Sequence, residues 1–195
     1  MRGQVAGIIL AAGASTRFGR PKQLLVYRGE ALVRRAASAA IAAGAAPVVV
    51  VLGANADIVA MALSGIDGVT LVANDRWSEG LASSLAAGIS AAVTIAPESD
   101  GILITVADQP RIGSGALRRL LSTFDQDHRL VAAQYAGTIG VPAIVGCEHF
   151  KEVCSLTGDA GAGRWLRTRL DDVTCVPMND AAADIDTHDD ATRHL

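Results

Sequence analysis

The sequence has few aromatic residues, with two tryptophans, two tyrosines and three phenylalanines among 195 residues. A folded core must therefore be packed mainly by aliphatic side chains, and these are abundant because 50% of the residues are hydrophobic. The chain also contains 36 alanines and 20 glycines, which allow helices and strands to approach one another closely. This hydrophobic content excludes an intrinsically disordered chain. A chain of this length buries about 70% of the surface that it exposes when unfolded.

The sequence is also poor in cysteine and has no strong excess of charge. The three cysteines, Cys147, Cys154 and Cys175, are too few and too irregular to indicate a disulfide framework, and they fit a reducing cytoplasm. With 17 basic and 20 acidic residues, the net charge is −3. Proteins that bind nucleic acid generally carry a basic face, so no nucleic-acid partner is expected. One nucleotide in a local basic pocket remains compatible with this balance.

No hydrophobic run predicts a membrane span. Residues 36–56 carry no formal charge, but Gly44 and Pro47 divide them into a helix end and a strand start. Each part is shorter than the roughly 20 apolar residues that a membrane helix needs. We therefore expect no membrane partner.

Continuous apolar runs alternate with segments of helical periodicity. The runs predict strands at Val5–Ala11, Val48–Leu52, Val69–Ala73, Ile102–Ala107, Leu130–Tyr135, Ala143–Val145 and Val173–Val176. The main helices are expected at Ala31–Ala43, Ala56–Leu63, Glu79–Val93 (capped by Ser78) and Ser114–Phe124. Runs without alternation are typical of strands covered on both faces. The pattern predicts a three-layer α/β/α, Rossmann-like fold with a mostly parallel sheet, in a single domain over residues 1–195.

A cluster of small and basic residues, Gly13 to Lys22, follows the first predicted strand directly. Ligands of open parallel sheets bind beyond the carboxyl ends of the strands. Small residues there let backbone N–H groups approach an anion, and Arg17, Arg20 and Lys22 add positive charge. The spacing matches neither a P-loop nor a dinucleotide fingerprint. The cluster therefore predicts a polyphosphate site, with a solvated basic turn as the alternative.

A second polar cluster, Asp108-Gln109-Pro110, follows the fourth predicted strand. The carboxylate of Asp108 stands where a buried strand ends, and it is a hard oxygen ligand that could hold Mg²⁺ against phosphate oxygens. An ordinary turn before proline is the alternative interpretation. Beside a polyphosphate loop, the cluster predicts a magnesium–phosphate site.

Several segments of the sequence resemble the motifs of one enzyme family. Residues 10–19 and the following Lys22-Gln23-Leu24-Leu25 resemble the opening signature of the MobA-like nucleotidyltransferases, and most closely that of molybdenum cofactor cytidylyltransferases. Ala12 favours the cytidylyl branch, since the guanylyl branch typically has glycine there. Later segments of the family are resembled in order by residues 77–85, Asp108-Gln109-Pro110, and residues 137–142, 158–162 and 184–187. Val141 stands where the family commonly has histidine.

The resemblance assigns roles to individual residues. It implies nucleotide binding by Leu10, Ala11, Ala12, Gly13, Ser15, Arg17, Lys22, Gly80 and Ser84. It implies catalytic roles for Arg17, Lys22 and Asp108, and Mg²⁺ binding by Asp108 with help from Asp186. On the acceptor side it points to Gly140, Pro142, Gly158 and Asp159.

The implied reaction transfers CMP from CTP to a phosphorylated pterin cofactor and releases pyrophosphate. The product would be the cytosine dinucleotide form of the molybdenum cofactor, for a client molybdoenzyme or its chaperone. The residues are also compatible with two alternatives. One is the same chemistry with GTP or another phosphorylated acceptor, and the other is a non-catalytic protein that binds and delivers a nucleotide or cofactor.

Overall fold

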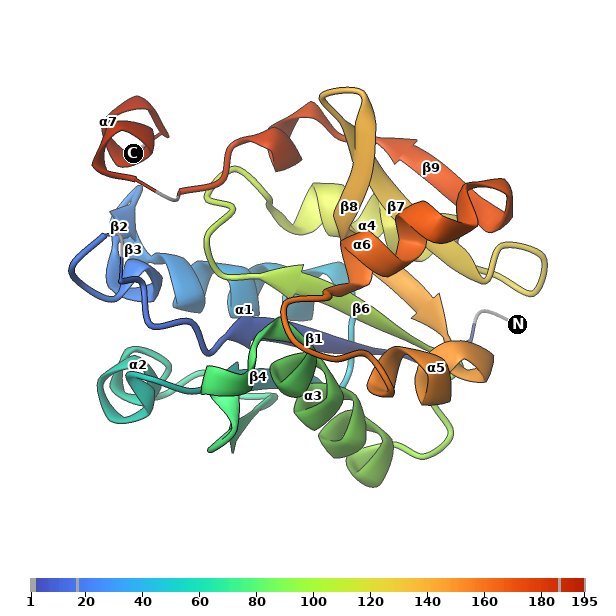
Figure 1. Ribbon diagram of the computed structural model, residues 1–195, viewed down its shortest axis with the longest axis horizontal. Coiled ribbons are helices and arrows are strands. Elements are labelled where there is room, and N and C mark those ends of the chain that lie inside the picture. Colours follow the sequence, from blue (N-terminus) through green and yellow to red (C-terminus); the bar gives the residue numbers. More distant parts are fainter. Residues whose placement is uncertain (1–2, 17, 186, 195) are drawn as a thin grey trace.

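The computed structural model describes residues 3–16, 18–185 and 187–194. Over these residues the main sheet has seven strands in the order β5-β4-β1-β6-β8-β7-β9 (Figure 1). Their bounds are β1 Val5–Ala11, β4 Val48–Leu52, β5 Val69–Ala73, β6 Gly101–Val106, β7 Leu130–Tyr135, β8 Thr138–Gly146 and β9 Val173–Pro177. A separate short ribbon pairs β2 (Val26–Tyr27) with β3 (Glu30–Ala31).

The pairing of the strands confirms a mostly parallel sheet. Strand β1 pairs in parallel with both β4 and β6, and β4 pairs in parallel with β5. Strand β8 is antiparallel to its neighbours β6 and β7, while β9 lies parallel to β7. The parallel pairs place the carboxyl ends of β1, β4, β5 and β6 at one edge, which is where the two polar clusters emerge.

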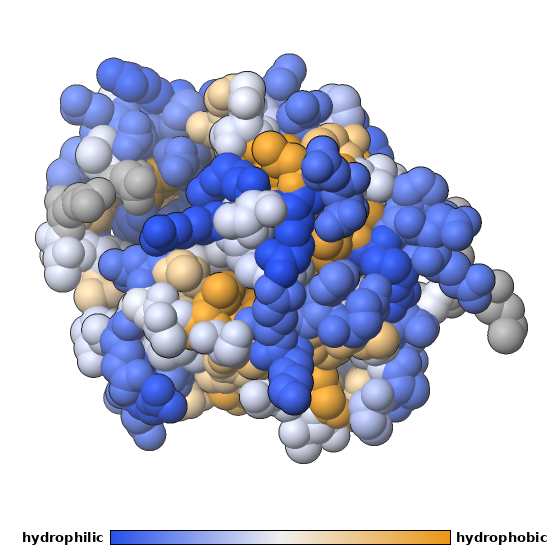
Figure 2. Space-filling view, turned by 45° about the vertical axis from the view of Figure 1, so that its right-hand side comes forward, coloured by the Kyte–Doolittle hydropathy of each residue, from blue (hydrophilic) through white to orange (hydrophobic). Residues whose placement is uncertain are grey.

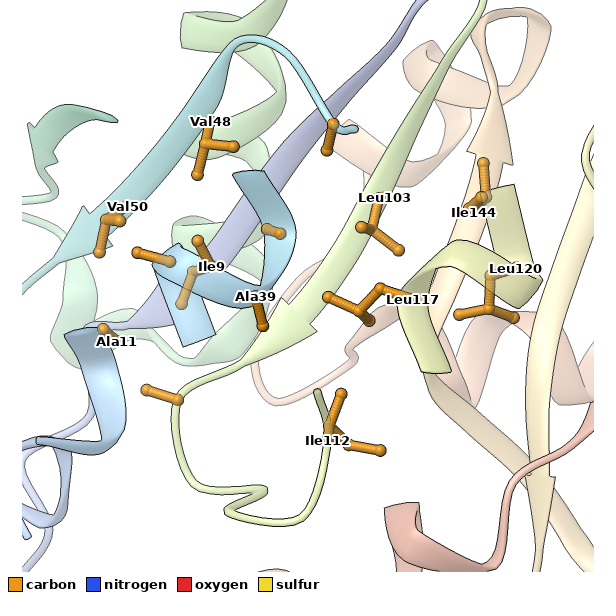
Figure 3. Close-up of a cluster of buried hydrophobic side chains, with 14 of the residues drawn as sticks. Ile9, Ala11, Ala39, Val48, Val50, Leu103, Ile112, Leu117, Leu120 and Ile144 are labelled. Carbon is orange, nitrogen blue, oxygen red and sulfur yellow. The ribbon is translucent and has the colours of Figure 1, made fainter. Parts of the chain in front are cut away.

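Helices cover both faces of the sheet, as the sequence predicts for three layers. Their bounds are α1 Leu32–Ala43, α2 Ala56–Ala62, α3 Leu81–Ile95, α4 Ser114–Thr123, α5 Phe150–Cys154, α6 Ala162–Leu166 and α7 His188–His194. Helices α1, α2 and α4 pack on one face, and α3, α5 and α6 pack on the other. Figure 3 shows the first core, where Leu117 and Leu120 of α4 meet Leu103 and Ile144 of the sheet.

Small residues bring the helices close to the sheet. A Cβ atom on Gly88 of α3 would stand 2.8 Å from Cγ2 of Ile8 in β1 and 2.9 Å from Cγ2 of Val51 in β4. On the opposite face, Ala37 and Ala40 of α1 are completely buried. At these positions, the small side chains are explained by close helix–sheet packing.

Some local expectations were wrong. Ser78 does not cap the third main helix, because Trp77–Glu79 forms a short 3-10 turn and α3 starts at Leu81 after Gly80. Strand β5 is not covered on both faces, since it forms an edge of the sheet and leaves Leu71 41% exposed. Strand β8 runs well beyond the Ala143–Val145 segment that its apolar residues indicated.

No helix within residues 3–16, 18–185 and 187–194 is both long enough and apolar enough to cross a membrane. On the face drawn in Figure 2, hydrophobic areas are separated from one another by hydrophilic side chains.

Candidate functional site

A cavity of about 540 Å³ opens at the carboxyl ends of β1 and β6. These strands lie side by side in the middle of the sheet (Figure 1). After β1 the chain continues to β4 and then β5 on one side of β1, and it returns to form β6 on the opposite side of β1. This reversal of strand order creates the crevice in which open α/β sheets bind ligands. The cavity walls come from residues 10–16, Phe18, Lys22, Gln23, Trp77, Ser78, Gly80, Leu81, Ser84, residues 106–108 and Asp159.

The loop after β1 is held by a buried amide. The side-chain Nε2 of Gln23 donates hydrogen bonds to the carbonyl oxygens of Ala11 and Gly13, at 2.9 and 2.8 Å. The intervening carbonyl of Ala12 accepts from the backbone N–H of Ala54 at 3.1 Å. Three successive carbonyls are therefore occupied, whereas the N–H groups of Gly13 and Ala14 donate to no group in the described part of the chain. Such a run of N–H groups is suited to an anion.

Ser15 accepts hydrogen bonds that hold the turn between β1 and Lys22. Its carbonyl accepts from the backbone N–H groups of Phe18 and Gly19, at 2.9 and 3.1 Å. Its hydroxyl accepts from the backbone N–H of Lys22 at 3.1 Å. Phe18 is buried and its ring stacks on that of His188 in α7, with centroids 4.2 Å apart. The loop is thus held by Ser15 before Lys22 and by Gln23 after it, and these contacts fix where the Lys22 side chain enters the cavity.

Lys22 and Asp108 meet in the cavity, although they are 86 residues apart in the sequence. Nζ of Lys22 lies 3.0 Å from Oδ2 of Asp108, and the two side chains are 15% and 29% exposed. The backbone carbonyl of Asp108 accepts from the N–H of Ile185 at 3.1 Å, which ties the C-terminal segment to this strand end. A basic group and a carboxylate so placed can bind a phosphate and a cation side by side.

The described part of the chain fits a metal that keeps phosphate oxygens among its ligands. It contains no group of three or more His, Cys, Asp or Glu side chains that could hold a metal ion. Mg²⁺ in nucleotide sites needs only one or two protein carboxylates together with the substrate phosphates, and Asp108 supplies one. The predicted second ligand, Asp186, and the predicted catalytic residue Arg17 lie outside the described residues.

Gly80 lies in the cavity wall opposite the loop after β1, where the chain packs closely against Gly158. Its φ of 112° favours glycine, and a Cβ atom there would stand 2.4 Å from the carbonyl carbon and oxygen of Gly158. The same carbonyl of Gly158 accepts from the N–H of Ala82 at 3.0 Å. Ser84, one turn into α3, lines the cavity while being only 3% exposed. Gly80 and Ser84 therefore face the same cavity as the loop after β1.

The predicted acceptor residues are not gathered in one place. Asp159 lines the cavity, whereas Gly158 packs behind Gly80. Gly140 and Pro142 lie on β8 and do not contribute to the cavity wall. Gln109 links their strand to the cavity, because it follows the wall residue Asp108 in the sequence. Its Nε2 donates to the carbonyls of Val141 and Ala181 at 3.1 and 2.9 Å.

Tyr135 is a polar group beside this acceptor segment that the sequence reasoning missed. Its hydroxyl donates to the carbonyl of Val141 at 3.3 Å, and a Cβ on Gly140 would stand 2.5 Å from that hydroxyl. Burial raises the pKa of Tyr135, and the negative charges of Asp184 and Asp108 raise it further. The hydroxyl therefore stays protonated at neutral pH, within the electrostatic reach of Asp108.

Two buried amides were also missed by the sequence reasoning. Gln23 is part of the opening signature, but its two bonds to loop carbonyls depend on the fold. Asn74 is 6% exposed and contacts the hydroxyl of Ser84. No signal in the sequence distinguishes this asparagine from the many that follow strands in turns.

Comparisons with known proteins agree with this geometry. A nicotine blue oxidoreductase of Paenarthrobacter nicotinovorans is 36% identical over 202 residues, covering 98% of this chain and 96% of that protein. The crystal structure of Rv0371c from Mycobacterium tuberculosis H37Rv is 30% identical with a TM-score of 0.82, covering 97% of both chains. A manganese complex of the same protein is 28% identical with a TM-score of 0.75, covering 100% of this chain and 99% of that one.

A nucleotidyl transferase from Methanothermobacter thermautotroptrophicus is 26% identical with a TM-score of 0.80, covering 97% of this chain and 95% of that one. The family model that describes the MobA-like NTP transferase domain matches residues 7–173, which include the whole cavity wall. The chain therefore belongs to the MobA-like NTP transferase domain family.

Proposed function

We propose that the protein transfers CMP from CTP to a phosphorylated pterin cofactor in a magnesium-dependent reaction that releases pyrophosphate. One observation carries the proposal. The Lys22–Asp108 pair lies in the same cavity as the loop whose N–H groups at Gly13 and Ala14 have no acceptor in the described part of the chain. Loop, lysine and carboxylate together match the needs of a nucleoside triphosphate and its cation.

The chemistry requires alignment and charge neutralisation rather than a protein nucleophile. A phosphate oxygen of the acceptor attacks the α-phosphorus of the nucleotide, the bond between the α-phosphorus and the bridging oxygen breaks, and pyrophosphate leaves with that electron pair. Because the attacking oxygen is already an anion, no general base is needed. The loop N–H groups bind the phosphates, and Lys22 neutralises the negative charge that grows on the leaving group.

Magnesium, held by Asp108 and in our proposal also by Asp186, would supply Lewis-acid neutralisation of the phosphate oxygens when bound. The manganese complex of the related Rv0371c supports the use of a divalent cation by this scaffold. The ammonium of Lys22 lies 3.0 Å from Oδ2 of Asp108 and neutralises that carboxylate. Nucleotide phosphates offer that ammonium an alternative partner, so nucleotide and cation are expected to strengthen each other's binding.

Finer parts of the proposal rest on sequence features. Ala12 favours CTP over GTP, and Asp159, Gly158, Gly140 and Pro142 are proposed to contact the acceptor. The same proposal includes a single domain over residues 1–195, a cytoplasmic location and delivery of the product to a client molybdoenzyme or its chaperone.

The proposal is tested by measuring pyrophosphate release with each of the four nucleoside triphosphates and Mg²⁺, with and without molybdopterin as acceptor. We expect release only when both CTP and the acceptor are present, and the loss of most of it in Asp108→Ala. Calorimetry on the same samples identifies a non-catalytic delivery protein, which would bind a nucleotide or cofactor tightly without turnover.

A second candidate function is supported by one comparison. The relative named nicotine blue oxidoreductase covers 98% of this chain at 36% identity, so oxidoreductase activity on a related scaffold needs consideration. In that case the cavity would hold the phosphates of a reduced nicotinamide dinucleotide, which transfers a hydride to a dye-like acceptor that then takes up a proton. Loss of absorbance of nicotine blue together with oxidation of NADH or NADPH, without pyrophosphate release, would favour this function.

A further inference from the structure

Asn74 is a buried amide in which both the oxygen and the nitrogen have hydrogen-bond partners. It is the first residue after β5, is 6% exposed, and lies behind the cavity wall formed by α3. Its Oδ1 accepts from the backbone N–H of Arg76 at 3.0 Å. Its Nδ2 donates to the hydroxyls of Ser83 and Ser84, each at 3.0 Å. If the oxygen and nitrogen of this amide exchanged places, the backbone N–H of Arg76 would lose its acceptor, so this contact sets the orientation of the amide.

This arrangement determines what the Ser84 hydroxyl can offer to a ligand. Because Oγ of Ser84 already accepts from Asn74, its own proton is directed to another acceptor. The usual internal acceptor for a serine in a helix is the carbonyl four residues earlier, here that of Gly80. That carbonyl lies 2.9 Å from Oγ of Ser83, whose single proton is shared between it and the carbonyl of Arg76 at 2.8 Å. Ser84 donates to no group in the described part of the chain, and it lines the cavity.

We propose that Asn74 is a positioning residue that makes Ser84 a hydrogen-bond donor toward the nucleotide base. The cavity would then select a base edge that presents an acceptor at this point, as cytosine does with O2 and N3. The inference rests on the proposed function in that it takes the bound ligand to be a nucleotide. It goes beyond it by assigning base selection to a residue that does not itself line the cavity.

Aspartate at position 74 reverses the hydrogen-bonding direction with almost no change in size. A carboxylate has no proton to donate, so the hydroxyl of Ser84 would turn and donate to it. Ser84 would then present only lone pairs to the cavity, facing the lone pairs of the base. Alanine at position 74 removes the amide instead, which leaves the Ser84 hydroxyl able to rotate toward the base at some entropic cost.

The experiment measures binding by calorimetry in the presence of Mg²⁺, with CTP as one ligand and inorganic tripolyphosphate as the other. Tripolyphosphate contacts the loop but has no base, so it reports any general damage to the site. We expect Asn74→Asp to weaken CTP binding about 10-fold, because lone pairs that face each other leave a polar contact unsatisfied, and to leave tripolyphosphate binding unchanged. Asn74→Ala should weaken CTP binding less than Asn74→Asp.

A double-variant cycle then tests whether Asn74 acts through Ser84. In the Ser84→Ala background, replacing Asn74 by Asp should produce little further loss of CTP affinity, because the hydroxyl that it orients is absent. Ser84→Thr keeps a hydroxyl and should retain selectivity. Thermal unfolding of each variant identifies those that are folded at the temperature of the titration.

Three results would overturn the inference. These are equal weakening of CTP and tripolyphosphate, a full additional loss in the double variant, or wild-type protein that binds CTP no tighter than tripolyphosphate. If Asn74→Asp does not fold, Asn74→Ala with the same pair of ligands decides between selective and general damage. Failure of the proposed reaction would appear separately, as wild-type protein that binds CTP selectively but releases no pyrophosphate with any acceptor.

Discussion

The two halves of the molecule are built in different ways. The half formed by β5, β4, β1 and β6 is entirely parallel, and its strand ends converge on a cavity whose loop is held by Gln23. In the half formed by β8, β7 and β9, one strand runs against its neighbours, and the predicted acceptor residues are spread over β8 and the segment around Asp159. The first half presents a loop and a lysine that are suited to an anion, whereas the predicted acceptor residues of the second half lie apart from one another.

Two contacts join these halves at the cavity. Gly80, before α3, packs directly on the backbone of Gly158, and Gln109, after β6, donates to the carbonyl of Val141 on β8. We therefore expect nucleotide binding to depend mainly on the first half, and transfer to require both halves.

The largest effect is expected for Asp108→Asn. The substitution keeps the shape of the side chain but removes the charge that pairs with Lys22 and that is proposed to hold the cation. We expect kcat/KM for pyrophosphate release to fall about 10²–10³-fold, with the melting temperature nearly unchanged. Asp67→Asn, at an exposed position away from the cavity, is the matched control and should behave as wild type. A similar rate in Asp108→Asn and wild type would remove this carboxylate from the reaction.

The next effect tests the junction at Gly80. Alanine there must adopt an unfavourable positive φ and would place Cβ against the backbone of Gly158. We expect a loss of about 2–4 kcal/mol in the free energy of unfolding and weaker binding of both substrates, measured by urea denaturation and calorimetry. Gly115→Ala is the control, because a Cβ there meets nothing within 4 Å inside α4, and it should stabilise slightly. Equal effects of the two variants would contradict the close packing at Gly80.

A smaller and more selective effect is expected for Tyr135→Phe. The change removes only the hydroxyl that contacts the carbonyl of Val141 beside the predicted acceptor segment. We expect KM for the pterin acceptor to rise about 5–10-fold while KM for CTP stays constant, consistent with the loss of one hydrogen bond. Initial rates at varied concentrations of each substrate give the two constants. A parallel rise in both would show that the halves are not functionally separate.

The smallest effect concerns stability far from the cavity. Arg129, before β7, forms hydrogen bonds with Glu148, after β8, and lowers the pKa of that carboxyl from 4.5 to about 2. A lowered pKa stabilises the folded state above pH 4.5, and the contribution is lost as the pH falls through about 2. The pair is partly exposed, so Glu148→Gln should cost about 0.5–1 kcal/mol at pH 7.

Urea denaturation of wild type and Glu148→Gln at pH 7, 4 and 2.5 measures this contribution. The difference between the two proteins should shrink as the pH falls, and pyrophosphate release at pH 7 should not change. A difference that stays constant with pH would assign the effect to packing rather than to charge.

Much of the parallel half could be predicted from the sequence because its signals are local. The runs at Val5–Ala11, Val48–Leu52 and Val69–Ala73 are strands with the bounds that their apolar residues indicate. The polar clusters at Lys22 and Asp108 follow directly from strand ends, so their meeting in space follows from parallel pairing. Thr187 caps α7, with its hydroxyl accepting from the N–H of Asp190 at 3.2 Å.

The remaining features depend on contacts between distant segments. The residues of β8 do not indicate that this strand runs antiparallel between β6 and β7. The residues of β5 likewise do not indicate that this strand is an exposed edge of the sheet. In the sequence Ser78 has the pattern of a helix cap, but Gly80 packs against Gly158 and α3 begins only after it. The roles of Gln23 and Asn74 arise only when their amides are buried beside loop carbonyls and serine hydroxyls.

The central claim is that the cavity between β1 and β6 transfers a nucleotide from its triphosphate. The most direct measurement incubates the protein with CTP, Mg²⁺ and molybdopterin, and determines released pyrophosphate and the mass of the product together. We predict one pyrophosphate for each cytosine dinucleotide formed, and neither product with Asp108→Asn. The claim would be contradicted if no nucleoside triphosphate gave pyrophosphate while the same protein reduced nicotine blue with NADH or NADPH.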